Sequence, residues 1–265
     1  MPRRRLDAEL VRRGLAGSAR EAAAAVSAGS VTVRGGPATN PAALVSSDDA
    51  VHRAEAGRRF VSRGGDKLSS ALAEFGVDAR GRRALDAGAS TGGFTDCLLR
   101  EGAAGVIAVD VGYGQLAWSL RTDPRVVVRE RTNVRHMQRS ALPFVPDLVV
   151  ADLSFVSLAG LVPHLVSLAS EAADLVLLVK PQFEAPAGAV PAGGVVRDPQ
   201  VRRRAIQRVA TACDAAGAGT IAVVTSPIAG SAGNVEYLLH ARLGAAAGTE
   251  AVLKSVDVGP AGADA

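Results

Sequence analysis

From about residue 80 the sequence alternates between short apolar runs and segments with helical patterning. The runs that predict strands read RRALDAGAS, AGVIAVDVG, RVVVRERTNV, PDLVVADLSF, ADLVLLVKPQF and TIAVVTSPIAG, and EAVLKSVDVG is expected to add a terminal strand. Helical stretches lie between them, among others around 157–171 and 199–216. This alternation requires an open, mostly parallel sheet covered by helices on both faces. The sequence therefore predicts a doubly wound α/β domain of seven strands, whose ligands would lie beyond the carboxyl ends of the strands.

The segment before this sheet follows a different pattern. RLDAELVRRGLAGS predicts a short helix, and SAREAAAAVSAGS predicts a second one that begins with Ser18 and Glu21 at capping-box spacing. SVTVRGG alternates like a short strand, with which ALVSSDDAVHR could pair. We expect a small α+β domain over residues 1–57, a linker over 58–65 and the sheet domain over 66–265.

The positive charge of the chain is concentrated in its first fifth. Residues 1–59 contain ten arginines and six acidic residues, which accounts for the whole net charge of +4. Such an asymmetry indicates a negatively charged partner, most often a nucleic acid, although a solvated basic face would look the same. The candidate RNA contacts are Arg3, Arg4, Arg5, Arg12, Arg13 and Arg20.

A glycine-containing loop, LDAGASTGGF, follows the first predicted strand, and Asp110 ends the next strand 22 residues after Gly88. Glycines allow a ligand to approach the backbone, and an acid about 20 residues further on can bind the hydroxyls of a ribose. The glycines at 88, 92 and 93 do not form the G-x-G-x-x-G pattern of dinucleotide sites. The loop therefore favours S-adenosylmethionine (SAM) over a dinucleotide, and a turn needed only for packing is the plain alternative.

Lysine is rare in this chain. Of the 30 basic residues only Lys67, Lys180 and Lys254 are lysines. Lys180 closes the fifth predicted strand, Asp152 ends the fourth, and Lys67 is expected at the head of a helix before the first. Glu236 lies in SPIAGSAGNVEY, after the sixth strand and a glycine-rich turn. Because strand ends meet at one edge of a parallel sheet, these side chains can converge over one pocket.

The order Lys, Asp, Lys, Glu resembles the tetrad of RNA ribose 2′-O-methyltransferases. A ribose 2′-hydroxyl is a poor nucleophile that must lose its proton during methyl transfer. Arginine stays protonated, whereas a lysine that is partly desolvated beside a second cation has a lowered pKa and can act as a base. Methylation of a base amine is disfavoured because ADLSF, after the fourth strand, lacks the prolines of that signature. A solvated lysine at a strand end is the alternative for each lysine alone.

The start of the chain, LDAELVRRGLAGSAREAAAAVSAGSVTVRGGPATNPAALV, resembles the S4 domain, an RNA-binding module of ribosomal proteins and RNA-modifying enzymes. Together with this start, the motifs SRGGDKL, LDAGASTGGFTDCLL, VDVGYGQL, ERTNVR, DLSF, VKPQFE and SPIAGSAGNVEY resemble the TlyA-type rRNA 2′-O-methyltransferases, a family also named hemolysins. The catalytic half of that family is similar to the FtsJ-like fold, a SAM-dependent methyltransferase fold of the Rossmann type. The resemblance implies 2′-O-methylation of cytidines in the 16S and 23S rRNA of both ribosomal subunits.

The resemblance also implies the site residues. Catalysis would use Lys67, Asp152, Lys180 and Glu236. The SAM pocket would consist of Asp86, Gly88, Ala89, Ser90, Thr91, Gly92, Asp110, Asn133 and Phe155. No metal is expected.

The remaining expectations concern partners and location. We expect a monomer that acts on rRNA within ribosomal subunits in the cytoplasm, with neither a signal peptide nor stable insertion into a membrane. Two functions of other classes compete with this one: a membrane-active hemolysin and a non-catalytic RNA-binding factor for ribosome assembly. Tyr113 and Trp118 could flank an adenosine, although we expect them to pack in the core, and Asn234 is expected to cap a helix.

Overall fold

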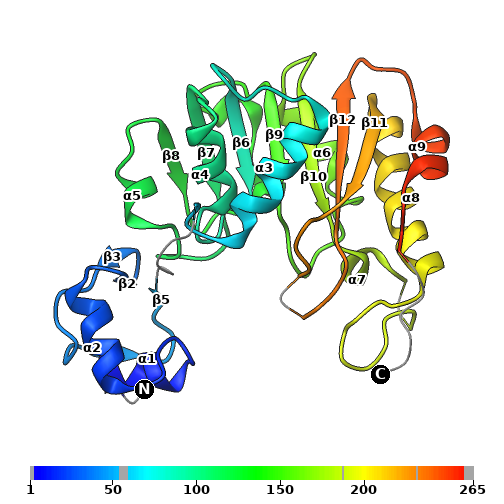
Figure 1. Cartoon of the computed structure of the whole chain (residues 1–265). Coiled ribbons are helices and arrows are strands. Elements are labelled where there is room, and N and C mark those ends of the chain that lie inside the picture. The colour runs from blue at the N-terminus through cyan, green and yellow to red at the C-terminus, as the bar shows by residue number, and fades with distance from the viewer. Residues whose placement is uncertain (1–2, 54–58, 187, 231, 260–265) are drawn as a thin grey trace.

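The computed structural model describes residues 3–53, 59–186, 188–230 and 232–259. These residues form a small N-terminal domain and a larger domain built on a seven-stranded sheet (Figure 1). The predicted domain end at residue 57 and the first linker residue, 58, lie outside the described residues.

The small domain consists of β1 (Arg3–Arg5), α1 (Leu6–Arg12), α2 (Ala19–Ser27), β2 (Val31–Val33), β3 (Gly36–Pro37), β4 (Leu44–Ser46) and β5 (Val51–Arg53). Its core is formed by apolar residues of both helices and of β2, β4 and β5, among them Leu6, Leu10 and Val26. The hydroxyl of Ser18 accepts a hydrogen bond from the Glu21 N–H at 3.2 Å, as the capping-box spacing predicts. β5 pairs with β2 as expected, whereas β4 pairs with β1, a strand that the sequence did not indicate.

The strands of the large sheet are β6 (Arg83–Ala87), β7 (Gly105–Val109), β8 (Val126–Arg129), β9 (Leu148–Ala151), β10 (Asp174–Val179), β11 (Ala218–Thr225) and β12 (Tyr237–Leu243). Their order is β11-β12-β10-β9-β6-β7-β8, and β12 is antiparallel to both neighbours. The mostly parallel seven-stranded sheet is thus confirmed, but the predicted terminal strand was wrong. That segment forms helix α9 (Thr249–Ser255), and the seventh strand is the buried run YLLHARL, whose alternating residues pack on both faces of the sheet.

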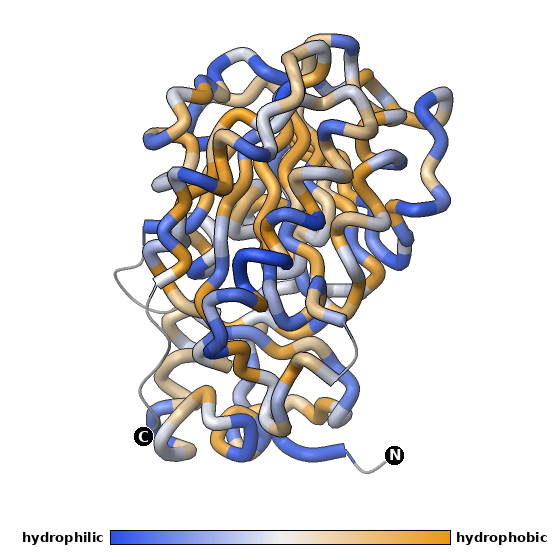
Figure 2. Tube along the Cα trace, turned by 90° about the vertical axis from the view of Figure 1, so that its right-hand side faces the viewer, coloured by the Kyte–Doolittle hydropathy of each residue, from blue (hydrophilic) through white to orange (hydrophobic). Residues whose placement is uncertain are grey.

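Helices cover both faces of the sheet (Figure 1). They are α3 (Arg63–Phe75), α4 (Gly93–Arg100), α5 (Trp118–Arg121), α6 (Val162–Leu168), α7 (Pro181–Glu184), α8 (Pro199–Ala215) and α9, with single 3-10 turns at Val134–His136 and Arg139–Ala141. Along β10, Leu175, Leu177 and Val179 pack toward α6 and α8, while Val176 and Leu178 pack toward α3 and α4. The apolar strands consequently run through the interior, as Figure 2 shows.

The carboxyl ends of the parallel strands lie at one edge of the sheet. Gly88, Asp110, Asp152 and Lys180 follow the ends of β6, β7, β9 and β10 within one residue. The strand order reverses at β6, which lies between β9 and β7. In open α/β sheets a ligand binds in the crevice beside such a reversal.

A buried charge cluster lies at the opposite edge. The Asp174 carboxylate is 2.9 Å from His240 Nε2 and accepts a hydrogen bond from Arg82 at 3.1 Å. Burial favours the protonated form of Asp174, but hydrogen bonds from His240 and Arg82 outweigh burial, so its pKa lies below the ordinary value.

Replacement of Asp174 with asparagine is expected to lower the free energy of unfolding at pH 7 by roughly 2 kcal/mol, since the hydrogen bonds that His240 and Arg82 make to the buried carboxylate are then weakened or lost. Because the folded pKa is depressed, this contribution is complete above the unfolded pKa of about 4 and is lost as the pH falls through the folded value. Denaturant unfolding between pH 3 and 7 should show parent and variant converging at low pH. Asp78→Asn, at an exposed position, is the control. If the free energies of unfolding of the parent and of Asp174→Asn differed equally at every pH, the lowered pKa of Asp174 would be contradicted.

Candidate active site

The loop between β6 and α4 brings two strand ends into contact. Gly88 has φ of +89°, and a Cβ atom there would lie 2.4 Å from the carbonyl oxygen of Asp152. Only glycine permits both this left-handed conformation and this close approach. The end of β6 therefore packs directly against the end of β9, and Asp152 is fixed relative to the loop.

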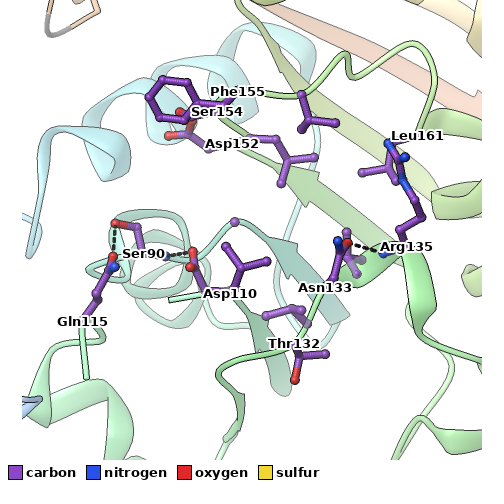
Figure 3. A pocket seen from close by; sticks show the side chains of 16 residues that line it. Ser90, Asp110, Gln115, Thr132, Asn133, Arg135, Asp152, Ser154, Phe155 and Leu161 are labelled. Atoms are coloured by element: carbon purple, nitrogen blue, oxygen red, sulfur yellow. Dashed lines mark hydrogen bonds between the residues drawn. The ribbon is translucent and has the colours of Figure 1, made fainter. Parts of the chain in front are cut away.

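A cavity of about 530 Å³ opens at this edge (Figure 3). Its wall includes five residues assigned to the SAM pocket from the sequence: Gly88, Ser90, Asp110, Asn133 and Phe155. The Asp110 carboxylate accepts hydrogen bonds from the backbone N–H groups of Ser90, at 2.8 Å, and Gly112, at 2.7 Å. It thereby ties the glycine loop to the end of β7, beside the cavity.

Phe155 forms an unusual part of this wall. Its φ of +63° is rare for an aromatic residue, and the residue is 92% exposed. The ring lies 5.2 Å, centroid to centroid, from the ring of Phe183 in α7. The pair joins the loop after β9 to the helix after β10.

A smaller cavity, of about 170 Å³, adjoins the first and shares Gly88, Ser90, Asp152 and Ser154 with it. Ala89 and Thr91, also assigned to the SAM pocket, lie on its wall together with Lys180. Ser62 and Gly64, where the chain enters α3, also line this cavity. The two cavities meet at Asp152.

The four tetrad residues form two ion pairs at this edge. Lys180 Nζ is 2.6 Å from Asp152 Oδ1 and donates to the Ser154 hydroxyl at 2.9 Å. Lys67 Nζ is 2.5 Å from Glu236 Oε2, and both residues are buried. Because Val179 pairs with Tyr237, Glu236 lies opposite Lys180 across β10 and β12. An amine that a carboxylate orients beside a cavity can accept or donate a proton there.

Comparison with known proteins assigns both domains. Residues 60–243 match the FtsJ-like methyltransferase family, and residues 4–51 match the S4 domain. The chain belongs to the FtsJ-like methyltransferase family. The resemblance drawn from the sequence motifs and the expected fold class are thereby confirmed.

Relatives resemble the chain over most of its length. A protein of Mycobacterium tuberculosis named 16S/23S rRNA (cytidine-2′-O)-methyltransferase TlyA is 52% identical over 97% of this chain and 99% of its own length. A Campylobacter jejuni protein named 23S rRNA (cytidine-2′-O)-methyltransferase TlyA is 36% identical over 68% of this chain and 70% of its own. A solved Streptococcus thermophilus structure that bears the name hemolysin is 33% identical, with a TM-score of 0.72 over 96% of this chain and 95% of that one.

Two residues assigned to the SAM pocket, Asp86 and Gly92, do not lie on the wall of either of these two cavities. Asp86 is fully buried under the loop, where the Thr95 hydroxyl donates to it at 2.6 Å. Burial raises the pKa of Asp86 to about 7. Gly92 instead allows α4 to begin against Leu120, whose Cδ1 would be 2.2 Å from a Cβ atom.

Glu184 is a site residue that sequence reasoning missed. Its buried carboxylate accepts a hydrogen bond from the Ser157 hydroxyl at 2.8 Å and another from the Leu158 N–H. Burial raises its pKa. These contacts hold the loop that carries Phe155 against α7. Glu184 is the last residue of the motif VKPQFE. Its place in that motif was the one sequence signal that could have identified it as a site residue.

Ser154 and Gln115 were also missed, because each acts through contacts between distant loops. Ser154 accepts from Lys180, and the Gln115 Oε1 accepts from the Ser90 hydroxyl at 3.2 Å. Neither residue stands out in the sequence by composition or by spacing.

The predicted core positions of Tyr113 and Trp118 were wrong, since the residues are 54% and 45% exposed. Leu116 and Leu120 of the same segment fill the core, which leaves both aromatic rings outside. The Arg131 guanidinium lies 4.1 Å from the centroid of the Tyr113 ring. The helix-cap prediction for Asn234 was also wrong: β12 follows it, and its side chain accepts from the Val196 N–H at 2.8 Å.

The six arginines assigned to RNA binding differ in their surroundings. Arg13 is tied into the small domain by hydrogen bonds to Glu9 and to the carbonyl groups of residues 46, 47 and 49. Arg5 and Arg12 are exposed and pair with Asp7 and Glu9. Three others are exposed and form no ion pair within the part of the chain that the structure describes, namely Arg3, Arg4 and Arg20.

Proposed function

We propose that the protein transfers the methyl group of SAM to the 2′-hydroxyl of cytidine riboses in 16S and 23S rRNA, within ribosomal subunits. The observation that carries this proposal is the Lys180–Asp152 pair at the junction of two cavities. The names of the Mycobacterium and Campylobacter relatives support the substrate. The name of the Mycobacterium relative gives both 16S and 23S rRNA, whereas that of the Campylobacter relative gives 23S rRNA alone. An experiment on both subunits therefore decides which rRNAs this protein methylates.

The residues of the large cavity suit SAM. Asp110 retains carboxylate lone pairs for the hydroxyls of a ribose. The Gly88–Ser90 backbone permits close approach, and Asn133 offers an amide group on the facing wall. SAM would supply an electrophilic methyl group bonded to a sulfonium.

In this proposal the Lys180 amine must first lose its own proton, and the neutral amine then accepts the proton of the 2′-hydroxyl as the oxygen–methyl bond forms and the sulfur–methyl bond breaks. The products would be the methylated ribose, the demethylated thioether form of SAM and a lysine ammonium. Asp152 and Ser154 hold the amine in place. The Lys67–Glu236 pair places a second cation beside the strand end. The small cavity between Lys180 and Gly64 would receive the ribose. Alignment of the oxygen with the methyl carbon would supply much of the acceleration.

The S4 domain would hold folded rRNA through phosphate contacts, largely without reading bases. Arg3, Arg4 and Arg20 are available for these contacts, since they are exposed on β1 and α2. We propose that the protein acts as a monomer in the cytoplasm.

Changing Arg3, Arg4 and Arg20 together to glutamine is expected to weaken binding to isolated 50S subunits and to reduce the slope of log affinity against log salt by about 2. The SAM affinity should stay unchanged. Filter binding at several salt concentrations measures the slope, with Arg80→Gln, exposed beyond the amino end of β6, as the control. An unchanged slope in the triple variant would place the rRNA contacts elsewhere.

No helix among the described residues has the length and apolar character needed to cross a membrane. A non-catalytic assembly factor would bind rRNA without needing SAM.

The proposed reaction is tested by incubating isolated 30S and 50S subunits with the protein and SAM and then mapping 2′-O-methyl groups. We expect new methyl groups on cytidines of both rRNAs. Modification of one subunit only would narrow the substrate, and absence of any new 2′-O-methyl group would overturn the proposal. Calorimetric titration with SAM separates an enzyme from an assembly factor.

A further inference from the structure

Arg202, near the start of α8, is a buried arginine that bonds to main-chain carbonyls. Its Nε donates to the Val196 carbonyl at 3.0 Å, and a terminal nitrogen donates to the Val258 carbonyl at 3.1 Å. It forms no ion pair with any residue in the described ranges. Burying a guanidinium without a carboxylate is costly. Both of its carbonyl partners lie in segments outside helices and strands, which it fixes in place.

One of these segments contacts Asn234, two residues before Glu236. The Val196 N–H donates to the Asn234 side chain at 2.8 Å, and the Asn234 amide donates to the Gly194 carbonyl at 2.8 Å. Val196 and Asn234 are each 1% exposed. Arg202 therefore holds Asn234, two positions before Glu236, through Val196.

The other segment leads to the residue after Glu236. Tyr237 is fully buried, and its hydroxyl donates to the Val258 carbonyl at 3.0 Å. The same carbonyl accepts from Arg202. The hydrogen bonds thus form a closed ring from Arg202 through Val196 and Asn234, along the chain to Tyr237, and back through Val258.

Glu236 lies inside this ring. Its carboxylate pairs with Lys67, and a Cβ atom on Gly230 would lie 2.5 Å from Glu236 Oε1. The Gly230 N–H donates to the Asn234 carbonyl at 2.9 Å. Asn234 consequently also holds the turn that packs against the carboxylate. The ring restrains Glu236 from both sides in sequence and from the turn beside it.

We infer that Arg202 and Tyr237 are positioning residues that hold Glu236, and through it Lys67, for methyl transfer. This inference rests on the proposed function, which gives the Lys67–Glu236 pair its role. Neither side chain lies on the wall of the two cavities, so each acts through the carboxylate and not on the substrate.

The test measures single-turnover methyl transfer to isolated subunits with radiolabelled SAM. Tyr237→Phe removes one hydroxyl, and Arg202→Met removes the guanidinium with little change in length. We expect the rate at saturating SAM to fall about 10-fold and about 100-fold respectively, since small misplacements of catalytic groups have effects of this size. The SAM dissociation constant should stay within about 2-fold of the parent value. Arg203→Met is the matched control, because Arg203 donates to the Leu253 carbonyl outside the ring.

Combination with Glu236→Gln distinguishes positioning from general loss of structure. If Tyr237 acts through Glu236, Tyr237→Phe adds no further loss to Glu236→Gln. Parental rates in Arg202→Met and Tyr237→Phe would overturn this inference, and so would a further 10-fold loss in the combined variant. Neither result would contradict the proposed function. A parental rate in Glu236→Gln would instead show that the proposed tetrad is wrong.

Discussion

Exchange of Lys180 for arginine is expected to reduce methyl transfer by at least about 10³-fold, the scale of general-base catalysis. Arginine keeps the positive charge but does not release its proton, and its planar guanidinium differs in shape from the single amine that contacts Asp152 and Ser154. SAM binding should persist, because Lys180 does not line the large cavity. Single-turnover assays and calorimetric titration measure the two quantities.

Lys254→Arg is the matched control, since Lys254 is exposed on α9 and lies on the wall of neither cavity. It should methylate at the parental rate. Substantial turnover by Lys180→Arg would exclude Lys180 as the base. A joint loss of SAM binding and of turnover would mean that Lys180 supports the cofactor site.

The second large effect is expected at Gly88. In Gly88→Ala the new methyl group would lie 2.4 Å from the Asp152 carbonyl oxygen, so the ends of β6 and β9 must separate. Both cavities border this contact. We expect SAM affinity and methyl transfer each to fall by about 10²-fold, because Asp152 and the glycine loop move together.

Gly81→Ala is a control with the same kind of strain and no clash. Gly81 has φ of +72°, and no atom lies within 4 Å of an added Cβ. The variant therefore measures only the cost of placing alanine in the left-handed conformation, which is about 1–2 kcal/mol of folding stability. If Gly88→Ala bound SAM as tightly as Gly81→Ala, the close packing of β6 on β9 would not matter for the site.

The sheet and the edge that carries the site could be predicted because they follow from local patterns. Apolar runs define the parallel strands, and residues just after strand ends must meet at one edge, which places Asp110, Asp152 and Lys180 together. The seventh strand could not be assigned in this way. Both YLLHARL and EAVLKSVDVG satisfy the pattern of a strand, and only tertiary packing decides between them.

The features that the sequence did not predict depend on contacts between loops that are distant in the chain. The sequence predicted that Asn234 caps a helix, because asparagine is a preferred N-cap residue and an apolar run follows it. Its partners, Val196 and Gly194, are about 40 residues away and act through main-chain groups, which leave no trace in residue type. The same holds for Arg202, which the sequence shows only as one of three consecutive arginines.

The place of β12 in the sheet has a consequence for biosynthesis. It is the last strand to be translated, yet it lies between β10 and β11, so those two strands have no partner on their facing sides until Leu243 has been made. Up to that moment the nascent chain exposes unpaired strand edges, which are prone to aggregation. Glu236 enters the site in the same step. An unfinished chain would therefore not bring the four residues of the proposed tetrad together, and we expect premature termination before residue 243 to yield an inactive, aggregation-prone fragment.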